Sequence, residues 1–215
     1  MINFFNVKTL TRDDSTLPIT VDDVKAYSQY FNYGELVDIS LDTHILRRIK
    51  NVITNWESET GFLIYDQTFK TSLYNQVNLF QGFKARLTRL NVRAFGDILY
   101  YPENWNNTDA KSTLSTDNYY FIPERDTDPA VFQLKEDICY INLYPVYNNL
   151  EITITAGYEA NDFTNMPQDI KDCLAMSVAD IIDVERQICG CDGMNALEVQ
   201  RIYRKYTAYT ATLTL

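Results

Sequence analysis

The chain has 215 residues and is 46% hydrophobic, so it can bury one sizeable core, or one core with an appended subdomain, without a disulfide or a metal. Its 29 acidic and 19 basic residues give a formal net charge of −10, which opposes broad attachment to nucleic-acid phosphates or anionic lipid. No stretch approaches the roughly 18 apolar residues of a membrane span, and the N-terminal residues do not show the basic region and long apolar run of a secretory leader. We therefore expect a soluble protein made in a cytoplasm, with no membrane partner.

The first predicted element is a short helix over residues 21–31. Thr20 can cap its first turn with the side-chain hydroxyl, and Asp23 follows at the spacing of a capping box. Ile19 and Val24 are placed as a hydrophobic staple around the same turn.

A longer helix is predicted to begin at Asp42 or Thr43 and to stop at Gly61. Apolar residues recur at helical spacing along it while the charged residues face elsewhere. These apolar residues are Ile45, Ile49, Val52, Ile53 and Trp56. His44, the only histidine, lies in the first turn, where a surface or capping role is favoured over catalysis.

Residues 67–158 form the β-rich part of the chain, because aromatic and β-branched residues are separated there by polar turn clusters. The clearest strand is 151–157, in which Ile152, Ile154 and Ala156 alternate with polar residues. This alternation predicts one buried face and one wet face. Two further candidate strands are 118–122 and 139–143.

A third helix is predicted to open at Pro167 and to end at Gly190. Its apolar stripe consists of Ile170, Leu174, Val178, Ile181 and Ile188. Residues 196–206 are predicted to form one more helix. The uncharged, β-prone residues 207–215 then form either a last strand or an arm that adds to a partner, and we slightly favour the arm.

Residues suited to catalysis or metal binding do not form a recognised motif in this sequence. No nucleophile elbow, phosphate-binding glycine loop, dinucleotide fingerprint or zinc pattern occurs. The thiols of Cys139, Cys173, Cys189 and Cys191 are interpreted as buried or incidental. We therefore predict a protein that is not an enzyme and that has no cofactor and no metal.

Several acidic residues are weaker candidates for chemistry. Asp126, Asp128, Glu136 and Asp137 could supply a carboxylate pair of the kind that glycoside hydrolysis uses. Asp180 and Asp183 are three residues apart on one predicted helix and could share a cation. Solvated surface acids are the favoured interpretation in both cases, because no spacing singles out a pair.

One basic cluster stands out against the acidic background. It consists of Lys84, Arg86, Arg89 and Arg93, interleaved with apolar residues. It could contact phosphates, but the net charge favours contact with the acidic surface of a neighbouring subunit, which would fix their register. The alternative is a solvated strand or helix.

Three segments, in chain order, resemble the head-tail connector proteins of tailed bacteriophages. Residues 17–27 resemble the family's opening Pro-Leu/Ile-Thr and its short acidic helix. Residues 46–61, continuing through 65–69, are similar to its long helix ending in Glu-x-x-Thr-Gly and the Gln-Thr strand that follows. The third segment resembles the family's strand, Ala-Gly-Tyr turn, proline-started helix and arginine-bearing exit. It comprises residues 152–158, 166–174 and 184–187.

The resemblance implies an α+β fold with a small helical core of three to four helices, a long β-rich insertion and an extended C-terminal arm. On this chain, residues 1–66 would form the N-terminal helical part of the core and 67–160 the insertion. Residues 161–195 would supply the helix that completes the helical part, and 196–215 the C-terminal helix or arm used for docking.

The resemblance also implies a structural virion protein. Members of the family form rings, typically of twelve subunits, that dock on the portal, extend the DNA channel and carry the next neck or tail protein. They have no catalytic residues, and their C-terminal segment commonly contacts the portal. On this chain the contacting residues would be Leu197, Ile202, Tyr203, Tyr206 and Tyr209.

The resemblance therefore places the chain in the virion neck, and in the host cytoplasm during assembly. DNA would pass through the ring without specific binding, because an acidic wall repels it.

Two other functions remain open from the sequence. The chain could be a tail-side neck or stopper protein of the same kind of particle. It could also be a β-rich module that binds carbohydrate or a host receptor, which needs aromatic side chains on one exposed face, whereas a connector buries many of them. An enzyme ranks third and depends on an acid pair sharing a cleft.

Overall fold

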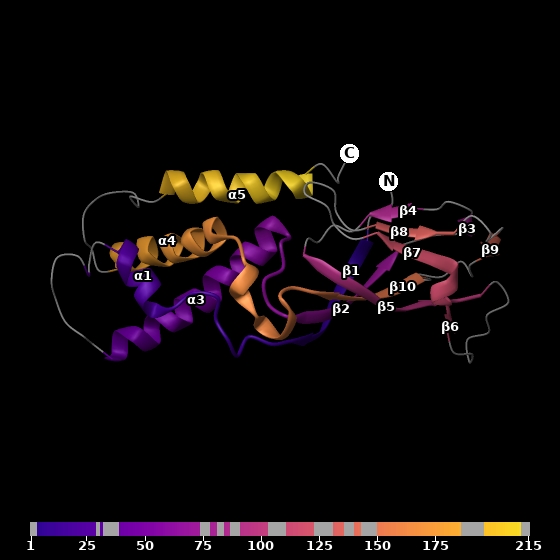
Figure 1. The fold of residues 1–215 in the computed structure, drawn as a ribbon, viewed down its shortest axis with the longest axis horizontal. Helices are drawn as coiled ribbons and strands as arrows, with labels where there is room; N and C mark the ends of the chain where they lie inside the picture. Colours follow the sequence, from indigo (N-terminus) through magenta and orange to yellow (C-terminus); the bar gives the residue numbers. More distant parts are fainter. Residues whose placement is uncertain are drawn as a thin grey trace. The chain divides into compact units, whose positions relative to one another are not determined.

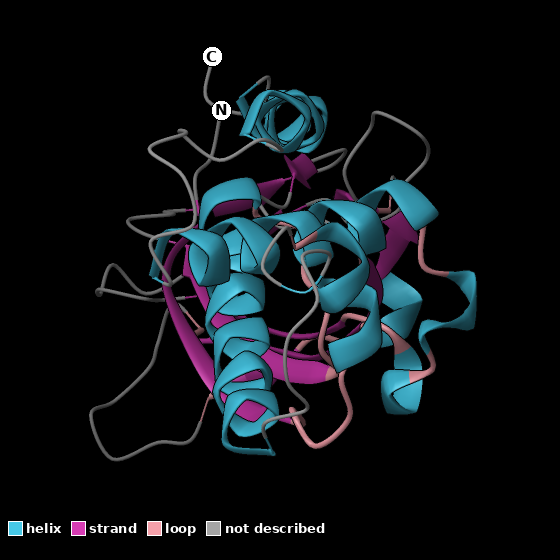
Figure 2. Cartoon of the chain, turned by 90° about the vertical axis from the view of Figure 1, so that its left-hand side faces the viewer, coloured by secondary structure: helices cyan, strands magenta, loops and turns pink. Residues whose placement is uncertain are grey.

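The computed structural model describes residues 4–28, 31, 39–73, 78–80, 84–86, 91–102, 111–122, 131–135, 140–142, 150–185 and 196–211. The described residues form an α+β structure, as the sequence predicts (Figure 1). Figure 2 distinguishes its helices from its strands.

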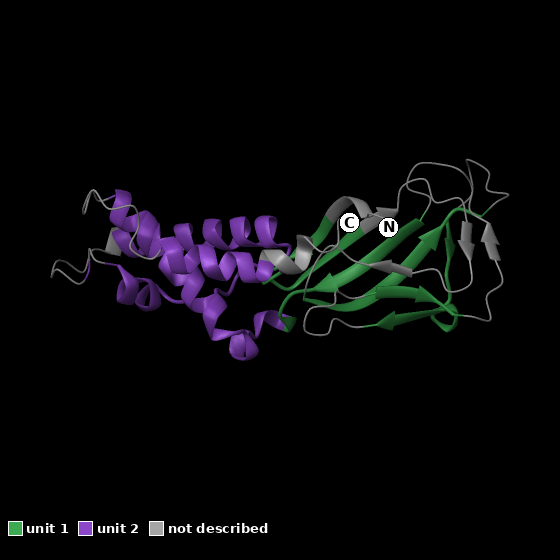
Figure 3. Cartoon of the chain, turned by 90° about the horizontal axis from the view of Figure 1, so that it is seen from above, with its two compact units in different colours: residues 1–13, 63–159, 209–215 green, residues 14–62, 160–208 purple. Residues whose placement is uncertain are grey.

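The chain divides into two compact units (Figure 3). The sheet unit comprises residues 1–13, 63–159 and 209–215, and the helical unit comprises residues 14–62 and 160–208. Each unit is therefore assembled from segments that are far apart in the sequence.

The helical unit contains four described helices. They are α1 Val21–Tyr27, α3 Ile39–Thr60, α4 Gln168–Glu185 and α5 Ala196–Ala211, whose last residues belong to the sheet unit.

Helix α1 begins with the predicted capping box. The Thr20 hydroxyl accepts from the Asp23 N–H at 3.2 Å, and the Asp23 carboxylate accepts from the Thr20 N–H at 2.7 Å. Val24 is fully buried, whereas the helix ends sooner than predicted, at Tyr27. It ends there because Ser28 is extended, and its hydroxyl donates to Asp183 at 2.5 Å.

Helix α3 confirms the predicted long helix and begins at Ile39, a few residues before the predicted start. The five apolar residues predicted for its stripe are all buried. The helix stops where predicted, because Gly61 adopts φ 75° and its N–H donates to the Glu57 carbonyl at 3.1 Å.

Helix α4 follows Pro167, whose carbonyl accepts the first helical hydrogen bonds from Ile170 and Lys171. Ile170, Leu174 and Val178 are fully buried, as the predicted stripe requires. The prediction was wrong at Ile181, which is only half-buried, because the buried face turns towards Ile182 at that end. Residues 188 and 190 lie outside the described part of the chain.

Helix α5 corrects the predicted extended arm. Residues 207–211 continue the helix that the sequence predicts over 196–206, so the described C-terminal segment is helical through Ala211. Extending a formed helix by one residue adds one hydrogen bond for one residue fixed, so the weak strand preference of Thr and Tyr is overridden. Residues 212–215 lie outside the described part.

The sheet unit contains ten described strands, all paired antiparallel. They are β1 Phe4–Arg12, β2 Gln67–Leu73, β3 Asn78–Phe80, β4 Lys84–Arg86, β5 Val92–Tyr100, β6 Ser112–Thr113, β7 Tyr119–Ile122, β8 Val131–Leu134, β9 Tyr140–Asn142 and β10 Leu150–Ala156. They form three sheets, in the orders β1-β2-β10-β5-β6, β4-β8-β7 and β3-β9.

Strand β10 confirms the clearest predicted strand. Leu150, Ile152, Ile154 and Ala156 are buried, and the residues between them are half-exposed. The buried face packs into a core that both larger sheets supply, with Phe132 and Leu134 of β8 fully buried in it. The predicted strands near 118–122 and 139–143 are also present, as β7 and β9.

Strand β1 was not predicted. Residues 1–66 were assigned to the helical part, yet Phe4–Arg12 pairs with β2 along the edge of the five-stranded sheet. Two register shifts interrupt this pairing, so β1 lacks the regular alternation that makes a strand visible in sequence.

Gly157 ends β10 in a conformation that only glycine adopts easily. Its φ is 87°, and a Cβ placed there would lie 1.8 Å from the Tyr65 carbonyl oxygen. Its N–H donates to the Asn91 carbonyl at 2.9 Å, so the turn is tied to a neighbouring segment of the same unit.

Replacing this glycine tests the turn. Gly157→Ala is expected to lower the free energy of unfolding by about 2 kcal/mol or more, because it combines a positive φ with a backbone clash. The measurement is urea unfolding of the full chain, followed by circular dichroism.

The matched control is Gly96→Ala in β5, where a Cβ would meet Thr153 at an ordinary 3.5 Å. This variant should stay within about 1 kcal/mol of the wild type. Equal losses for the two variants would contradict the role assigned to Gly157.

Candidate functional site

Helix α5 is the candidate docking element, and it packs on Trp56 of α3 and on Phe62, which follows that helix. Trp56 is fully buried and makes edge-to-face contacts with Tyr203 and Tyr206, at ring-centroid distances of 4.7 and 5.5 Å. Phe62 makes a third such contact with Tyr206, at 5.6 Å. Each contact of this geometry contributes about 0.5–1.5 kcal/mol beyond its buried area, so together they hold α5 on α3.

A polar clamp joins α5 to the first turn of α4. The Asp169 carboxylate accepts from Lys205 Nζ at 2.5 Å and from the Tyr206 hydroxyl at 2.9 Å. Burial raises the pKa of Asp169, but the hydrogen bonds from Lys205 and Tyr206 outweigh burial and bring the pKa below its ordinary value. The carboxylate is therefore ionised at neutral pH.

The structure separates the five residues predicted to contact a portal. Leu197 has 83% of its surface exposed, whereas Ile202 and Tyr206 are buried at 4% and 8%. Tyr203 is half-buried against Trp56, and the side chain of Tyr209 lies outside the described part. With α5 in this position, Leu197 is thus accessible to a partner, while Ile202 and Tyr206 stabilise the helical unit.

Cys173 lies on α4 where α5 crosses it. Its thiol points to the Val199 carbonyl, with Sγ and O 3.9 Å apart, and burial raises its pKa to about 12. Reactive cysteines need an accessible thiolate, so Cys173 acts as a small core residue. The other three cysteines lie outside the described part.

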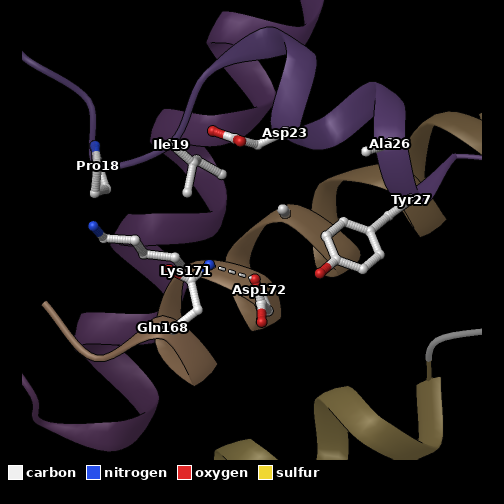
Figure 4. Close-up of a pocket in the computed structure, with 9 residues that line it drawn as sticks. Pro18, Ile19, Asp23, Ala26, Tyr27, Gln168, Lys171 and Asp172 are labelled. Atoms are coloured by element: carbon white, nitrogen blue, oxygen red, sulfur yellow. Dashed lines mark hydrogen bonds between the residues drawn. The ribbon is translucent and has the colours of Figure 1, made fainter.

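A crevice of about 450 Å³ lies between α1 and α4 (Figure 4). Ile19 and Ala26 line it beside Asp23, Asp172 and Lys171, so it combines an apolar surface with two carboxylates and one ammonium group. The Tyr27 hydroxyl points towards Asp172, and burial together with that carboxylate raises the pKa of Tyr27. Sequence reasoning missed the crevice, because it depends on how two helices distant in sequence pack.

Among the acidic residues considered for chemistry, Asp183 has a structural contact in the described part of the chain. Asp183 accepts from Ser28, and Glu185 pairs with both His44 and Arg48 between α3 and α4. His44 therefore has the surface role that the sequence favours. No group of three metal-ligating side chains occurs among the described residues, and residues 126, 128, 136 and 137 lie outside them.

Of the basic cluster, Arg93 is the residue whose side chain the structure describes. Arg93 pairs with Asp66, and its second guanidinium nitrogen lies 3.7 Å from Glu159. Lys84 and Arg86 belong to β4, and Arg89 lies outside the described residues. Arg93 thus contributes to the sheet unit itself.

Aromatic residues of the sheet unit pack mainly into its core. Phe95 contacts Phe121 and Phe132, with ring centroids 4.6 and 6.3 Å apart, and Tyr119 contacts Phe132 at 5.4 Å. Tyr120 is half-exposed, with Lys135 Nζ 5.0 Å above its ring. The described aromatic residues therefore do not form the exposed platform that sugar binding needs.

The fold is that of a class of chains found in the neck of phage-like particles. One structural match covers 94% of this chain and 95% of a chain in the neck of an empty gene transfer agent (GTA) particle, computed with C6 symmetry. The TM-score of that match is 0.64 and the sequence identity is 14%. The resemblance to head-tail connector proteins is thus confirmed at the level of the fold.

Two further solved structures agree. A chain in the virion of the native GTA particle matches with a TM-score of 0.62 and 13% identity, over 92% of this chain and 94% of that one. A chain in the native GTA neck, computed with C12 symmetry, matches with a TM-score of 0.56 and 14% identity over the same shares. No protein-family model and no curated protein matches the sequence.

None of the described helices is both long and apolar enough to cross a membrane.

Shortening Tyr206 tests the attachment of α5. Tyr206→Phe should cost about 0.5–1.5 kcal/mol, since it removes the hydrogen bond to Asp169 and keeps the ring contacts. Tyr206→Ala should cost about 3–5 kcal/mol, because it also removes the ring from Trp56 and Phe62. Urea unfolding measures both, and hydrogen exchange should show increased exchange in α5. A Phe variant as unstable as the Ala variant would contradict this division of the stabilisation between the hydroxyl hydrogen bond and the ring contacts.

Acid should weaken the same clamp. Because folding lowers the pKa of Asp169, its ionised form stabilises the fold above the unfolded-state pKa of about 4, and this stability is lost as the pH falls through the folded-state value. Asp169→Asn should therefore be less stable than the wild type at pH 7 and lose less stability on acidification. Unfolding midpoints between pH 7 and pH 3 test this, and parallel pH profiles for the two proteins would contradict it.

Proposed function

We propose that the chain is a structural subunit of a virion neck, a head-to-tail connector that forms a ring beneath the portal. The observation that carries this proposal is the agreement in fold over 94% of this chain and 95% of a GTA neck chain. A match of that extent includes both units, and only small parts of the two chains remain unmatched. The neck structures with C6 and C12 symmetry support a ring of identical subunits, and twelve is the number we propose.

The proposed mechanism is physical rather than chemical. In a closed ring each subunit buries one surface against the next, so the rotation at that contact sets the number of subunits and the bore. A net charge of −10 suits a wall along which DNA slides without specific binding. The ring would extend the channel of the portal and offer a platform for the next neck or tail protein.

We propose that α5 docks on the portal, with Leu197 as its first contact. At 83% exposure, Leu197 is the most exposed large hydrophobic residue in the described part of the chain. If Ile202, Tyr203 and Tyr206 also engage the portal, α5 must leave α3, because they pack on Trp56 or lie buried in the helical unit. The residues proposed for contact with a neighbouring subunit are Lys84, Arg86 and Arg89, with Arg93 anchored inside its own sheet unit.

The mass of the purified full chain in solution, alone and with its portal, tests the proposal. We expect a ring under at least one of these conditions, measured by native mass spectrometry and electron microscopy. Leu197→Ser should weaken binding to the portal by about tenfold or more without changing stability, because Leu197 has few contacts to lose within its own chain.

The matched control is Val184→Ser at the end of α4, which removes a residue that is 60% exposed. It should bind the portal as the wild type does. A chain that stays monomeric and ignores the portal would overturn the proposal, and a ring that binds only the tail side would make the chain a stopper protein.

A further inference from the structure

We propose that the crevice between α1 and α4 is the receiving half of the contact between neighbouring copies, and that it accepts the basic edge of α3 from the next copy. The basic edge is the exposed set Leu46, Arg47 and Lys50. This inference rests on the proposed ring and adds a contact between helical units to the one proposed above for the basic cluster of the sheet unit.

The crevice is open and mixed in chemistry. It provides about 450 Å³ between two helices of one unit, with Ile19 and Ala26 on its apolar side. Asp172 accepts from Gln168 at 2.8 Å, and the Tyr27 hydroxyl points to it, so that carboxylate is held in place (Figure 4). Asp23 is held by the capping box of α1. Lys171 also lines the crevice, and its ammonium end lies towards Pro18 and away from Asp172 (Figure 4). Two fixed carboxylates against this one ammonium leave the crevice with a net negative charge, which suits a cation carried on an apolar stem.

The basic edge of α3 supplies that chemistry. Leu46 is 40% exposed, and Arg47 and Lys50 are exposed beside it. Lys50 lies 3.6 Å from Asp14, and both side chains are about half exposed, so this ion pair is weak. Leucine and lysine at positions i and i+4 share one helix face, so both can enter one crevice.

The other basic helix of the unit is a poorer match. On α5, Arg201 already pairs with Glu198 and Lys205 with Asp169, and the exposed Arg204 lies on the helix proposed to dock on the portal. A ring also needs two different surfaces on each subunit, one receiving and one inserting. The crevice and the basic edge meet this requirement with opposite charge, and complementary charge fixes the register.

Two single variants and their combination test the contact in the full chain, under whichever condition gives the wild-type ring. Ala26→Arg adds bulk and positive charge to the crevice, and Arg47→Glu reverses the charge of the basic edge. Each should weaken ring formation by about tenfold or more. The double variant should recover most of it, because the carboxylate introduced on α3 of one copy then faces the guanidinium introduced in the crevice of the next.

The matched control is Arg12→Glu, the same charge change at an exposed position of β1 in the sheet unit. It should assemble as the wild type does, and the thermal stability of the three test variants should match that of the wild type. Single variants that assemble normally, a double variant that fails to recover, or a loss confined to Arg12→Glu would overturn this contact while the ring itself stands. A wild type without a ring under either condition would instead overturn the proposed function.

Discussion

The pairing of β10 on both of its sides is the interaction on which the sheet unit depends. This strand bonds to β2 along its whole length and to β5 on the other side, and its alternate residues fill the core. Among the described strands, β1 pairs with β2 alone, so its place depends on β10 as well. The positive φ of Gly157 ends the strand, and the chain then leads directly towards α4.

The helical unit is held by a different kind of contact. Helices α3 and α4 share charged pairs at one end, where Glu185 meets His44 and Arg48, whereas α5 is held by aromatic rings and by Asp169. Surface ion pairs contribute little and aromatic burial contributes more, so the position of α5 rests mainly on Trp56 and its two tyrosine partners. A partner that competes for those tyrosines would have to replace that burial.

Sequence reasoning succeeded where a local rule was sufficient. The capping box of Thr20 and Asp23, the stop at Gly61 and the alternation around Ile154 each follow from spacing within one element. Sequence reasoning failed where the conformation of a segment depends on more than its own local residue preferences. Strand β1 follows from pairing with β2, and α5 is helical beyond residue 206 although its sequence favours strands locally.

The candidate surfaces show the same limit. The sequence identified Leu197 and Tyr206 together as docking residues, and only their contacts separate an exposed leucine from a buried tyrosine. The crevice beside Tyr27 and Asp172 could not be predicted, because its two walls are about 145 residues apart in the sequence and meet only through tertiary packing.

The chain passes between its two units at residues 13/14, 62/63, 159/160 and 208/209. A single proteolytic cut at any one of these crossings leaves the other covalent connections intact, so the two units stay tethered. Tension between the units would likewise be shared among these backbone connections. In the neck subunit proposed above, such redundancy would give a joint that does not fail at one peptide bond.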